Sequence, residues 1–535
     1  MTWSLENSKN DESSKVRWEL VPYFHGRVLD IGCGPYKAFP HFIGVDNGHH
    51  WGMIGADVKC EAQDLSLFSS QSCNVVYSSH LLEHIPYEDV PAVLTEWCRI
   101  VKQGGYVILY LPDEAQYPAV GHKNANPDHR WNVNHDKVLA AMEAQKRGWD
   151  LIDYQVRSET DEYSLFFVFK LTAGSAHTFS WKLPKPEKTC AVVRYGAIGD
   201  QIMTSSIFHG LKEQGYYITL YCQDNDGYQA IMHDPHIDRF IIQGKDEVPP
   251  QFLEEFWNYT RKKYTKWINL CESVESTLLA SPGRANWEWP NELRARYLNR
   301  NYLEWTHDLA GVPPPYRPKF YSTQEERSWA KDKARSYGRR NILWSLSGSS
   351  GHKVWPHLDA VINLVLATYP DTHVVLVGDE FCRLLQTGWD GYADKNEKFI
   401  EKQMNPRVHC MAGKWTIRQS MSFAEVADLI IGTETGLLNA AGHMDVPKIV
   451  TLSHSSEEML TKHWKNVIAL NQPQGVGCGK HPCRQLHGAS NHDPWEDCPK
   501  HEETGTALCQ YHIGPELMWE AITSALGTER MVAYG

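Results

Sequence analysis

The sequence predicts an α/β protein in which short apolar strands alternate with helices over three successive stretches of the chain. Strand-like runs rich in β-branched residues are followed by helical patterns, which indicates parallel sheets covered by helices on both faces. A strand also runs into a glycine-bearing turn in each stretch, at residues 28–34, 192–199 and 428–436. Such junctions point backbone N–H groups into a crevice where ligands commonly bind.

Length and composition set limits on the class of protein. The 535 residues exceed what one hydrophobic core usually supports, and 42% hydrophobic with 22% charged residues is ordinary for globular proteins. The net charge of −12 argues against a protein that coats nucleic acid or anionic membranes. No apolar run is long enough to span a bilayer, the first residues lack a signal-peptide core, and most cysteines lie in apolar surroundings. We expect a cytoplasmic protein, in the host cytoplasm if it is viral.

Residues 1–174 have the pattern of a nucleoside-cofactor domain. Gly32 and Gly34 follow the first buried strand and let the backbone approach a ligand closely. Asp46 ends the next strand, where a carboxylate can accept hydrogen bonds from both hydroxyls of a ribose. Asp64 follows, and then come a strand, a helix and another strand.

Five motifs in this order resemble the class I S-adenosylmethionine-dependent methyltransferases of small molecules. They are DIGCG (30–34), GVD (44–46), QDL (63–65), SSHLLEHI (78–85) and KQGGYVIL (102–109). The resemblance implies a Rossmann-like, seven-stranded sheet that ends in an antiparallel strand pair. It also implies that Asp30, Gly32 and Gly34 surround the methionine part of the cofactor, Asp46 the ribose and Asp64 the adenine. An inactive fold that has lost its cofactor is the alternative.

The loop at 121–135 follows the strand that ends at Pro112 and is expected to form part of a lid. It carries Asp128, His129, Trp131 and His135. A histidine there could remove a proton from a hydroxyl, but a surface loop with chance histidines explains the pattern equally well. The sequence therefore assigns no catalytic base in this domain.

A polar, proline-bearing linker at 175–188 precedes a second α/β stretch at 189–330. This stretch opens with the strand–turn–helix segment VVRYGAIGDQIMTSSIFHGL (192–211). Asp200 lies where the strand meets the helix. It could cap the helix N-terminus or act chemically in the crevice beyond the strand.

Residues 331–535 repeat the alternation of strands and helices. The turn at 432–436 precedes LLNAAG and presents N–H groups at a helix start, which suits a diphosphate. An ordinary tight turn is the alternative.

The two later stretches together resemble the heptosyltransferase-like glycosyltransferases of family 9, which have the twin-Rossmann GT-B fold. The motifs are RYGAIGDQIMTSS (194–206), SGSSGHKVWP (347–356) and GTETGLLNAAG (432–442). The resemblance implies an acceptor lobe at 189–330 and a nucleotide-sugar lobe at 331–535.

By this resemblance Asp200 is the general base on the acceptor hydroxyl. Donor contacts would come from Gly199, Lys353, Thr435 and Gly436. A carboxylate base opposite the leaving diphosphate predicts inversion at the sugar carbon without a required divalent metal. Two departures put sugar and nucleotide identity in doubt: Asn439 replaces the usual histidine, and Glu434 stands where aspartate is common.

A Cys/His-rich insertion is expected at 475–512. Its cysteines are Cys478, Cys483, Cys498 and Cys509. Their spacing is looser than in a standard zinc ribbon, so a structural zinc site, two disulfides and four buried thiols all stay open.

The leading hypothesis is a bifunctional enzyme that uses S-adenosylmethionine and a nucleotide sugar on a glycan or another hydroxylated acceptor. One alternative acceptor is a hydroxylated nucleobase in viral DNA, against which the acidic net charge weighs. Another alternative is a structural or assembly protein with inactive enzyme folds. Sugar, acceptor and oligomeric state are not fixed by the sequence.

Overall fold

The structure is a computed structural model and describes residues 11–50, 52–159, 161–244, 246–348, 350–386, 388–393, 399–487 and 498–527. It divides into two compact units. The first unit comprises Met1–Glu187 and Ile241–Tyr264, and the second comprises Lys188–Phe240 and Thr265–Gly535. Both are α/β, as the sequence predicts. Among the helices of the described residues, none is both long and apolar enough to cross a membrane.

The first unit is built on an eight-stranded sheet in the order β3-β2-β1-β4-β5-β7-β6-β8. The strands are β1 (Val28–Ile31), β2 (Ile43–Asp46), β3 (Val58–Lys59), β4 (Cys73–Ser79), β5 (Val101–Pro112), β6 (Trp149–Arg157), β7 (Ser164–Leu171) and β8 (His177–Thr178). Strand β1 pairs in parallel with β2 and β4, and β7 runs antiparallel to β5 and β6. The seven strands expected are thus joined by the two-residue β8, which pairs with β6.

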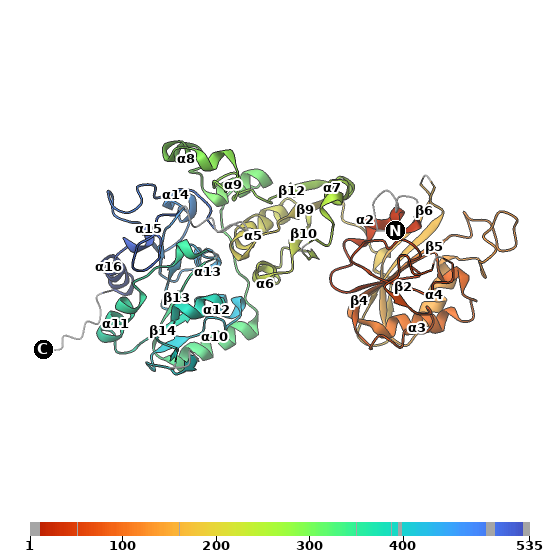
Figure 1. The fold of residues 1–535 in the computed structure, drawn as a ribbon, viewed down its shortest axis with the longest axis horizontal. Helices are drawn as coiled ribbons and strands as arrows, with labels where there is room; N and C mark the ends of the chain where they lie inside the picture. Colours follow the sequence, from red (N-terminus) through yellow and green to blue (C-terminus); the bar gives the residue numbers. More distant parts are fainter. Residues whose placement is uncertain are drawn as a thin grey trace. The chain divides into compact units, whose positions relative to one another are not determined.

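Helices cover both faces of this sheet (Figure 1). They are α2 (Glu12–Leu20), the short 3₁₀ helix η1 (Leu82–His84), α3 (Val90–Ile100) and α4 (His135–Glu143). Helix α3 buries Val93, Leu94 and Trp97 in the core that it shares with α4 and the sheet strands. This apolar face recurs at helical spacing, so the segment folds as a helix that packs on a sheet.

Two short segments extend the first unit beyond its sequence-predicted boundary at 174. Part of the predicted linker forms β8 and the 3₁₀ helix η2 (Ser180–Lys182), where the Ser180 hydroxyl donates to Asp150 at 2.5 Å. The segment 241–264 holds η3 (Pro250–Phe252) and α7 (Leu253–Arg261). Its Phe252 ring lies 5.7 Å from the Trp18 ring of α2, which explains why these residues group with the first unit.

The second unit contains two sheets, ordered β11-β10-β9-β12 and β17-β14-β13-β18-β19-β20. The first has β9 (Thr189–Val193), β10 (Tyr217–Gln223), β11 (Arg239–Gln243) and β12 (Lys266–Asn269), and the division between the two units falls within β11, after Phe240. The second has β13 (Arg340–Ser345), β14 (Thr372–Val377), β17 (Val408–Cys410), β18 (Leu429–Thr433), β19 (Lys448–Thr451) and β20 (Val467–Leu470). A two-stranded ladder joins β15 (Gly391–Ala393) to β16 (Phe399–Glu401). All recorded pairings within the two larger sheets are parallel.

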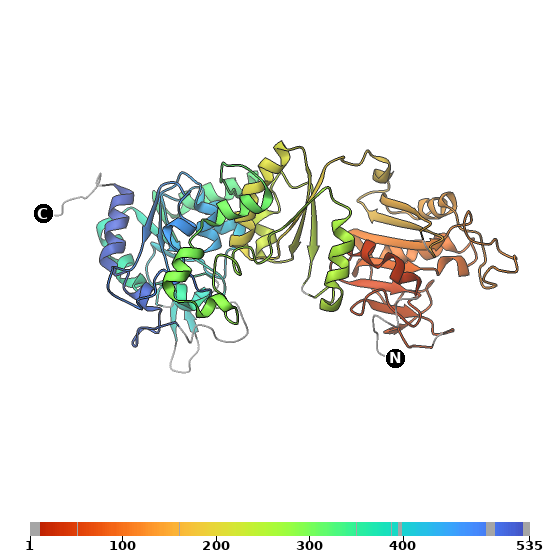
Figure 2. The same ribbon diagram turned by 90° about the horizontal axis from the view of Figure 1, so that it is seen from above.

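Helices connect these strands in the expected alternation. Those of the first lobe are α5 (Ile198–Glu213), α6 (Asp226–Ile231), η4 (Ala285–Glu288), α8 (Asn291–Tyr297) and α9 (Tyr302–Ala310). Those of the second lobe are α10 (Gln324–Tyr337), η5 (Gly351–Lys353), α11 (Leu358–Thr368), η6 (Phe381–Gln386), α12 (Ile417–Ala424), α13 (Gly436–Ala441), α14 (Glu457–Leu460), α15 (Leu508–Tyr511) and α16 (Pro515–Leu526). Helix α16 lies beside α11 and buries Met518 and Ile522 in the core of the second lobe (Figures 1 and 2). Helices α5 and α13 begin just past the carboxyl ends of β9 and β18, which is where the second unit has its main cavity.

Candidate functional sites

A cavity of about 700 Å³ lies between the two lobes of the second unit. Gly199 and Asp200 line it from the start of α5, whereas Lys353, Thr435 and Gly436 line it from the other lobe. The structure therefore brings together all five residues to which the sequence assigned the base and the donor contacts. The volume lies within the range of cavities that hold nucleotide-sized ligands.

Asp200 occupies the third position of α5, and Ala197 is the N-cap. One oxygen of the Asp200 carboxylate accepts a hydrogen bond from the Ala197 N–H at 2.8 Å. Its other oxygen lies 2.6 Å from the Arg194 guanidinium. The carboxylate is thus held at the helix start and at the cavity wall together, so capping and chemistry are compatible roles. Each carboxylate oxygen keeps a lone pair for an acceptor hydroxyl.

Arg194 is the buried cation that fixes this carboxylate, and its side chain is 2% exposed. It also pairs with Glu275 at 2.8 Å and donates to the Leu270 carbonyl at 2.7 Å. Glu275 lines the same cavity. One arginine fork therefore positions two carboxylates at the cavity, a geometry that suits the rigid planar guanidinium.

Lys353 supplies a cation on the opposite wall. Its ammonium is buried and donates to the Glu434 carbonyl at 3.1 Å. Burial lowers the pKa of Lys353, while the negative charges of Glu434 and Asp200 act in the opposite direction. A Cβ on Gly348 would lie only 3.1 Å from both that carbonyl and the Lys353 side chain. A side chain at Gly348 would therefore crowd the turn before α13.

Glu434 also lines this cavity, and its carboxylate is engaged with the loop after β19. Its buried carboxylate accepts from the Ser453 and Ser455 N–H groups, both at 3.0 Å, and lies 2.8 Å from His454 Nδ1. Burial by itself raises the pKa of Glu434, but His454, Lys353 and these donors lower it well below its ordinary value. Its role is to tie the turn after β18 to the loop after β19.

The starts of α5 and α13 contact each other across the cavity. A Cβ on Gly436 would lie 2.3 Å from the Ile198 side chain, and one on Gly199 would lie 3.0 Å from the Asn439 amide. Glycine is therefore required sterically at Gly436. Asn439, which departs from the family pattern, faces the first lobe at this contact.

In the first unit, Gly32 and Gly34 both adopt positive φ angles, +72° and +55°. A Cβ on Gly32 would lie 2.7 Å from the Leu81 side chain, so the glycine turn packs directly against the segment after β4. Asp30 is buried, accepts from the Ala38 N–H at 2.8 Å, and has its pKa raised to about 7 by burial. These residues form a tight turn at the carboxyl edge of the parallel strands.

Asp46 lies beside this turn at the end of β2. Its two oxygens accept from the N–H groups of Gly34 at 3.1 Å and Gly48 at 2.7 Å. Asp64 is exposed in a turn, where its carboxylate accepts from the Ser66 N–H at 3.0 Å. The structure thus connects Asp46 to the glycine turn by a hydrogen bond, whereas among the described residues Asp64 makes no such bond.

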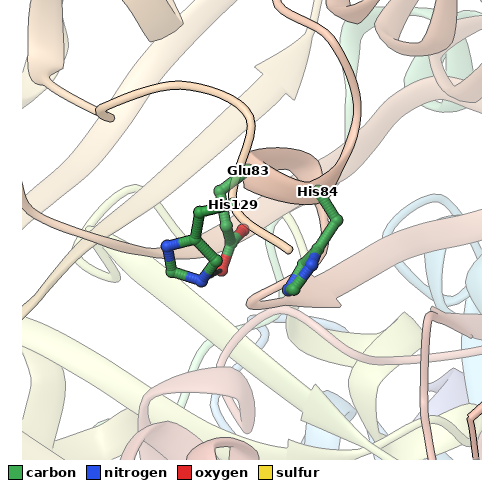
Figure 3. Close-up of side chains that lie close together, drawn as sticks. All are labelled: Glu83, His84 and His129. Atoms are coloured by element: carbon green, nitrogen blue, oxygen red, sulfur yellow. Dashed lines mark ion pairs between the residues drawn. The ribbon is translucent and has the colours of Figure 1, made fainter. Parts of the chain in front are cut away.

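A cluster of Glu83, His84 and His129 lies at the end of η1, as Figure 3 shows. One potential ligand atom from each residue lies within 4.8 Å of the others. Burial raises the pKa of Glu83 to about 8 and lowers that of His129 to about 4. His129 belongs to the loop expected to form a lid, and it is buried rather than exposed.

The four cysteines of the insertion line one small cavity, together with His481 and His487. All four are free thiols, so the structure contains neither of the two disulfides considered. Burial raises the pKa of Cys483 to about 11 and that of Cys498 to about 12. Their sulfurs do not form a compact ligand group of the kind seen at Glu83, in a search limited to the described residues. Structural zinc at Cys478, Cys483, Cys498 and Cys509 stays a prediction, which metal analysis of the purified protein can check.

A comparison with known protein families agrees with the first of the two resemblances. Residues 6–157 match the model of a family described as a methyltransferase domain, which confirms that prediction for the N-terminal part of the chain. Comparison with curated proteins gave no match.

Solved structures similar to this chain include glycosyltransferases and methyltransferases. The ADP-heptose LPS heptosyltransferase II of E. coli is 15% identical, with 63% of this chain and 98% of that chain covered and a TM-score of 0.44. A glycosyl transferase family 9 protein of Veillonella parvula is 14% identical, with 64% and 98% covered and a TM-score of 0.43. A SAM-dependent methyltransferase of Archaeoglobus fulgidus is 20% identical, with 30% and 94% covered and a TM-score of 0.24. Likeness of this degree says nothing about substrates.

The sequence did not reveal the residues that join a site only through tertiary contacts. Arg194 begins the motif RYGAIGDQIMTSS, but the sequence assigned it no role. Glu275 lies in none of the motifs. The SSHLLEHI motif contained Glu83 and His84, but only the fold shows that His129, 45 positions later, joins them. The one signal in the sequence for this cluster was a Glu-His pair directly after a strand together with a later loop that contains histidines.

Proposed function

We propose that the chain is a bifunctional enzyme, with sugar transfer in the second unit and methyl transfer in the first. The observation that carries the glycosyl-transfer part is the cavity lined by Asp200 on one side and by Lys353 and Thr435 on the other. A carboxylate and a cation on opposite walls suit attack by an acceptor hydroxyl with departure of a nucleoside diphosphate.

In this proposal Asp200 accepts the proton of the acceptor hydroxyl as its oxygen attacks the anomeric carbon. Arg194 holds the carboxylate in place, and Lys353 offsets the negative charge that grows on the leaving diphosphate. Because the base and the leaving group lie on opposite sides of the sugar, the reaction inverts the anomeric configuration. The acceptor is a glycan or another hydroxylated molecule.

Asp200→Asn tests the glycosyl-transfer proposal. The amide keeps the size of the side chain and the acceptor for the Ala197 N–H, but its NH2 group can neither take up the proton nor pair with Arg194. We expect kcat to fall by about 10²- to 10⁴-fold, the usual contribution of a general base. The donor is first found by screening nucleotide sugars for a rise in melting temperature, and the rise should persist in the variant.

Two further variants serve as comparisons for Asp200→Asn. Asp332→Asn changes an exposed carboxylate of α10, so its turnover should equal that of the wild type. Glu275→Gln alters the other carboxylate held by Arg194 and should have the smaller effect. If turnover fell only in Glu275→Gln, the base would be Glu275 instead of Asp200.

For the first unit, the chemistry of the turn residues fits S-adenosylmethionine. The left-handed glycines give close backbone access, and the Asp46 oxygens retain lone pairs for ribose hydroxyls. Asp30, Gly32, Gly34 and Asp46 would hold the cofactor, with Asp64 toward the adenine. The bound cofactor would supply an electrophilic methyl group, and this unit would orient the hydroxyl that receives it.

Calorimetric titration with S-adenosylmethionine tests this part of the proposal. Two alternative functions compete with the proposal as a whole. A hydroxylated nucleobase as acceptor predicts salt-dependent binding of DNA that carries it. A structural protein with inactive folds predicts no binding of S-adenosylmethionine and no nucleotide sugar that raises the melting temperature. Either result would overturn the corresponding part of the proposal.

A further inference from the structure

The Glu83 carboxylate is unusual because it is a buried acidic group without a hydrogen-bond donor among the described residues. It is fully buried, and neither of its oxygens accepts a hydrogen bond within the described part of the chain. Buried carboxylates are normally paired, hydrogen-bonded or bound to a metal. Its near neighbours are imidazoles: His80 Nδ1 lies 3.5 Å and His129 Nε2 3.8 Å from the same oxygen, Oε1.

The distances within the cluster approach those of a metal site. Ligand atoms of Glu83, His84 and His129 all lie within 4.8 Å of one another. Two nitrogen or oxygen ligands, each about 2.0–2.2 Å from a shared ion, lie roughly 3–4 Å apart. Small side-chain movements would close the difference. In Figure 3 the Glu83 carboxylate lies between the two imidazole rings.

Hydrogen bonds to backbone carbonyls hold the loop that carries His129 beside η1, although the two segments are distant in the sequence. The Arg130 N–H donates to the Glu83 carbonyl at 2.7 Å, and the Trp131 indole donates to the Leu82 carbonyl at 3.0 Å. The two residues that follow His129 are therefore hydrogen-bonded to η1, which carries Glu83 and His84. Such support from surrounding groups is what gives a metal site its precision.

The cluster also lies next to the glycine turn. Leu81, just before η1, occupies the space that a Cβ on Gly32 would need, at 2.7 Å. Strands β1 and β4, which precede the two segments, are parallel neighbours, so both segments leave the same edge of the sheet. An ion at the cluster would therefore lie on the side of the sheet where the cofactor turn is.

We propose that Glu83, His84 and His129 bind one divalent transition-metal cation whose remaining positions take a hydroxyl oxygen of the methyl acceptor. Two imidazoles and a carboxylate form a nitrogen–oxygen set that suits zinc, iron, cobalt, nickel or manganese. With three protein ligands the ion keeps positions open for a substrate. The cation site stands on the geometry alone, whereas its role toward the acceptor rests on the proposed methyltransferase activity.

The competing explanation is a protonated, uncharged Glu83 that needs no cation. Glu83→Gln separates the two, because glutamine matches a neutral acid in size and polarity but is a poor metal ligand. If Glu83 serves only as a neutral acid, the variant binds as much metal as the wild type. If it is a ligand, the variant loses the cation.

The test uses the full-length protein, stripped with a chelator and then titrated with Co²⁺, Mn²⁺ or Zn²⁺. Bound metal is measured by elemental analysis, and Co²⁺ is also followed by its visible absorption. We expect the wild type to bind one equivalent more than Glu83→Gln, His84→Ala or His129→Ala. Affinity at this site should fall by more than the 10- to 100-fold typical when a supporting residue is lost.

His122→Ala is the matched control, because His122 is an exposed histidine of the same loop. It should bind metal as the wild type does, and melting temperatures confirm that each variant is folded. Equal metal content in the wild type and the three ligand variants would overturn the proposal, as would cobalt spectra that show thiolate ligands alone. Loss of the cation in the variants supports the site even if no methyl transfer is detected, since only the proposed activity would then fail.

Discussion

At the scale of single residues, Arg194 decides how the candidate catalytic carboxylate is presented. It is 2% exposed and bridges Asp200 and Glu275, which both line the cavity. A buried arginine that pairs with two carboxylates is compensated for its desolvation by charge and by hydrogen bonds. In the proposed reaction Arg194 is therefore a positioning residue, which would act on the acceptor only through Asp200.

Arg194→Lys keeps the charge but loses the fork that reaches both carboxylates. We expect kcat for sugar transfer to fall about 10- to 100-fold, as a misplaced catalytic group commonly causes. The KM for the nucleotide sugar should change little, because Arg194 pairs with Asp200 and Glu275 rather than with the donor-binding residues. Steady-state kinetics with the donor varied at saturating acceptor measures the two constants separately.

An exposed arginine provides the control for this substitution. Arg335→Lys alters a side chain of α10 that is 78% exposed, and both constants should stay at the wild-type values. A rise in KM with unchanged kcat in Arg194→Lys would contradict the positioning role and would indicate that Arg194 binds donor.

At the scale of elements, short connections after parallel strands carry both candidate sites. The turn between β18 and α13 depends on Glu434, which binds the backbone of the loop after β19. This carboxylate stabilises one element against another, so its contribution is to folding and only indirectly to donor binding.

Glu434→Gln should lower the free energy of unfolding of the second unit by about 3 kcal/mol at pH 7, the usual cost of breaking a buried charged pair. The folded-state pKa of Glu434 is below its ordinary 4.5, so its stabilisation exists above that pH and is lost as pH falls further. The difference between wild type and variant should therefore shrink below about pH 4.5. Urea unfolding at several pH values measures it.

Glu458→Gln is the control for this measurement. Glu458 is an exposed residue of α14 that pairs with Lys462 at 2.6 Å, and surface pairs of this kind contribute under about 1 kcal/mol. A difference for Glu434→Gln that stays constant from pH 7 to pH 3 would show that the carboxylate charge is not what stabilises the turn.

At the scale of the whole molecule, each compact unit has its own hydrophobic core and its own candidate site. The glycine turn, Asp46 and the Glu83 cluster all belong to the first unit, and the large cavity belongs to the second. The two chemistries therefore need not share residues. Under the proposed function, joining the two units on one chain would expose a common substrate to both sites at high effective concentration.

Gly32→Ala tests this independence. A Cβ would strain the left-handed backbone and press on Leu81 at 2.7 Å, so S-adenosylmethionine affinity should fall by about tenfold or more. The rise in melting temperature with the nucleotide sugar should be unchanged. Calorimetry with S-adenosylmethionine and thermal melting with the donor measure the two effects.

Gly121→Ala serves as the matched variant. Gly121 also has a positive φ, +86°, but a Cβ there meets nothing within 4 Å. It should bind S-adenosylmethionine as the wild type does. If Gly32→Ala also abolished the effect of the nucleotide sugar, the two sites would not be independent.

Most of the fold and much of the site could be predicted from local patterns. Strand–turn–helix junctions identified the glycine turns, and the structure places Asp200, Lys353 and Thr435 around one cavity as expected. The extent of the first unit was less accessible, because α7 joins it only through packing of Phe252 on Trp18. Contacts between residues more than two hundred positions apart leave no local signal.

By itself, the sequence determined the alternation of elements, the glycines that turns require and the order of the two enzyme-like parts. These follow from hydrophobic periodicity and backbone sterics, which act between residues close in the chain. Only the tertiary structure decided that Arg194 pairs with two carboxylates, that Glu434 binds the backbone of the loop after β19, and that His129 lies beside Glu83. Such pairings depend on which segments the packed cores bring together, and burial then fixes the charge and hydrogen bonding of each group.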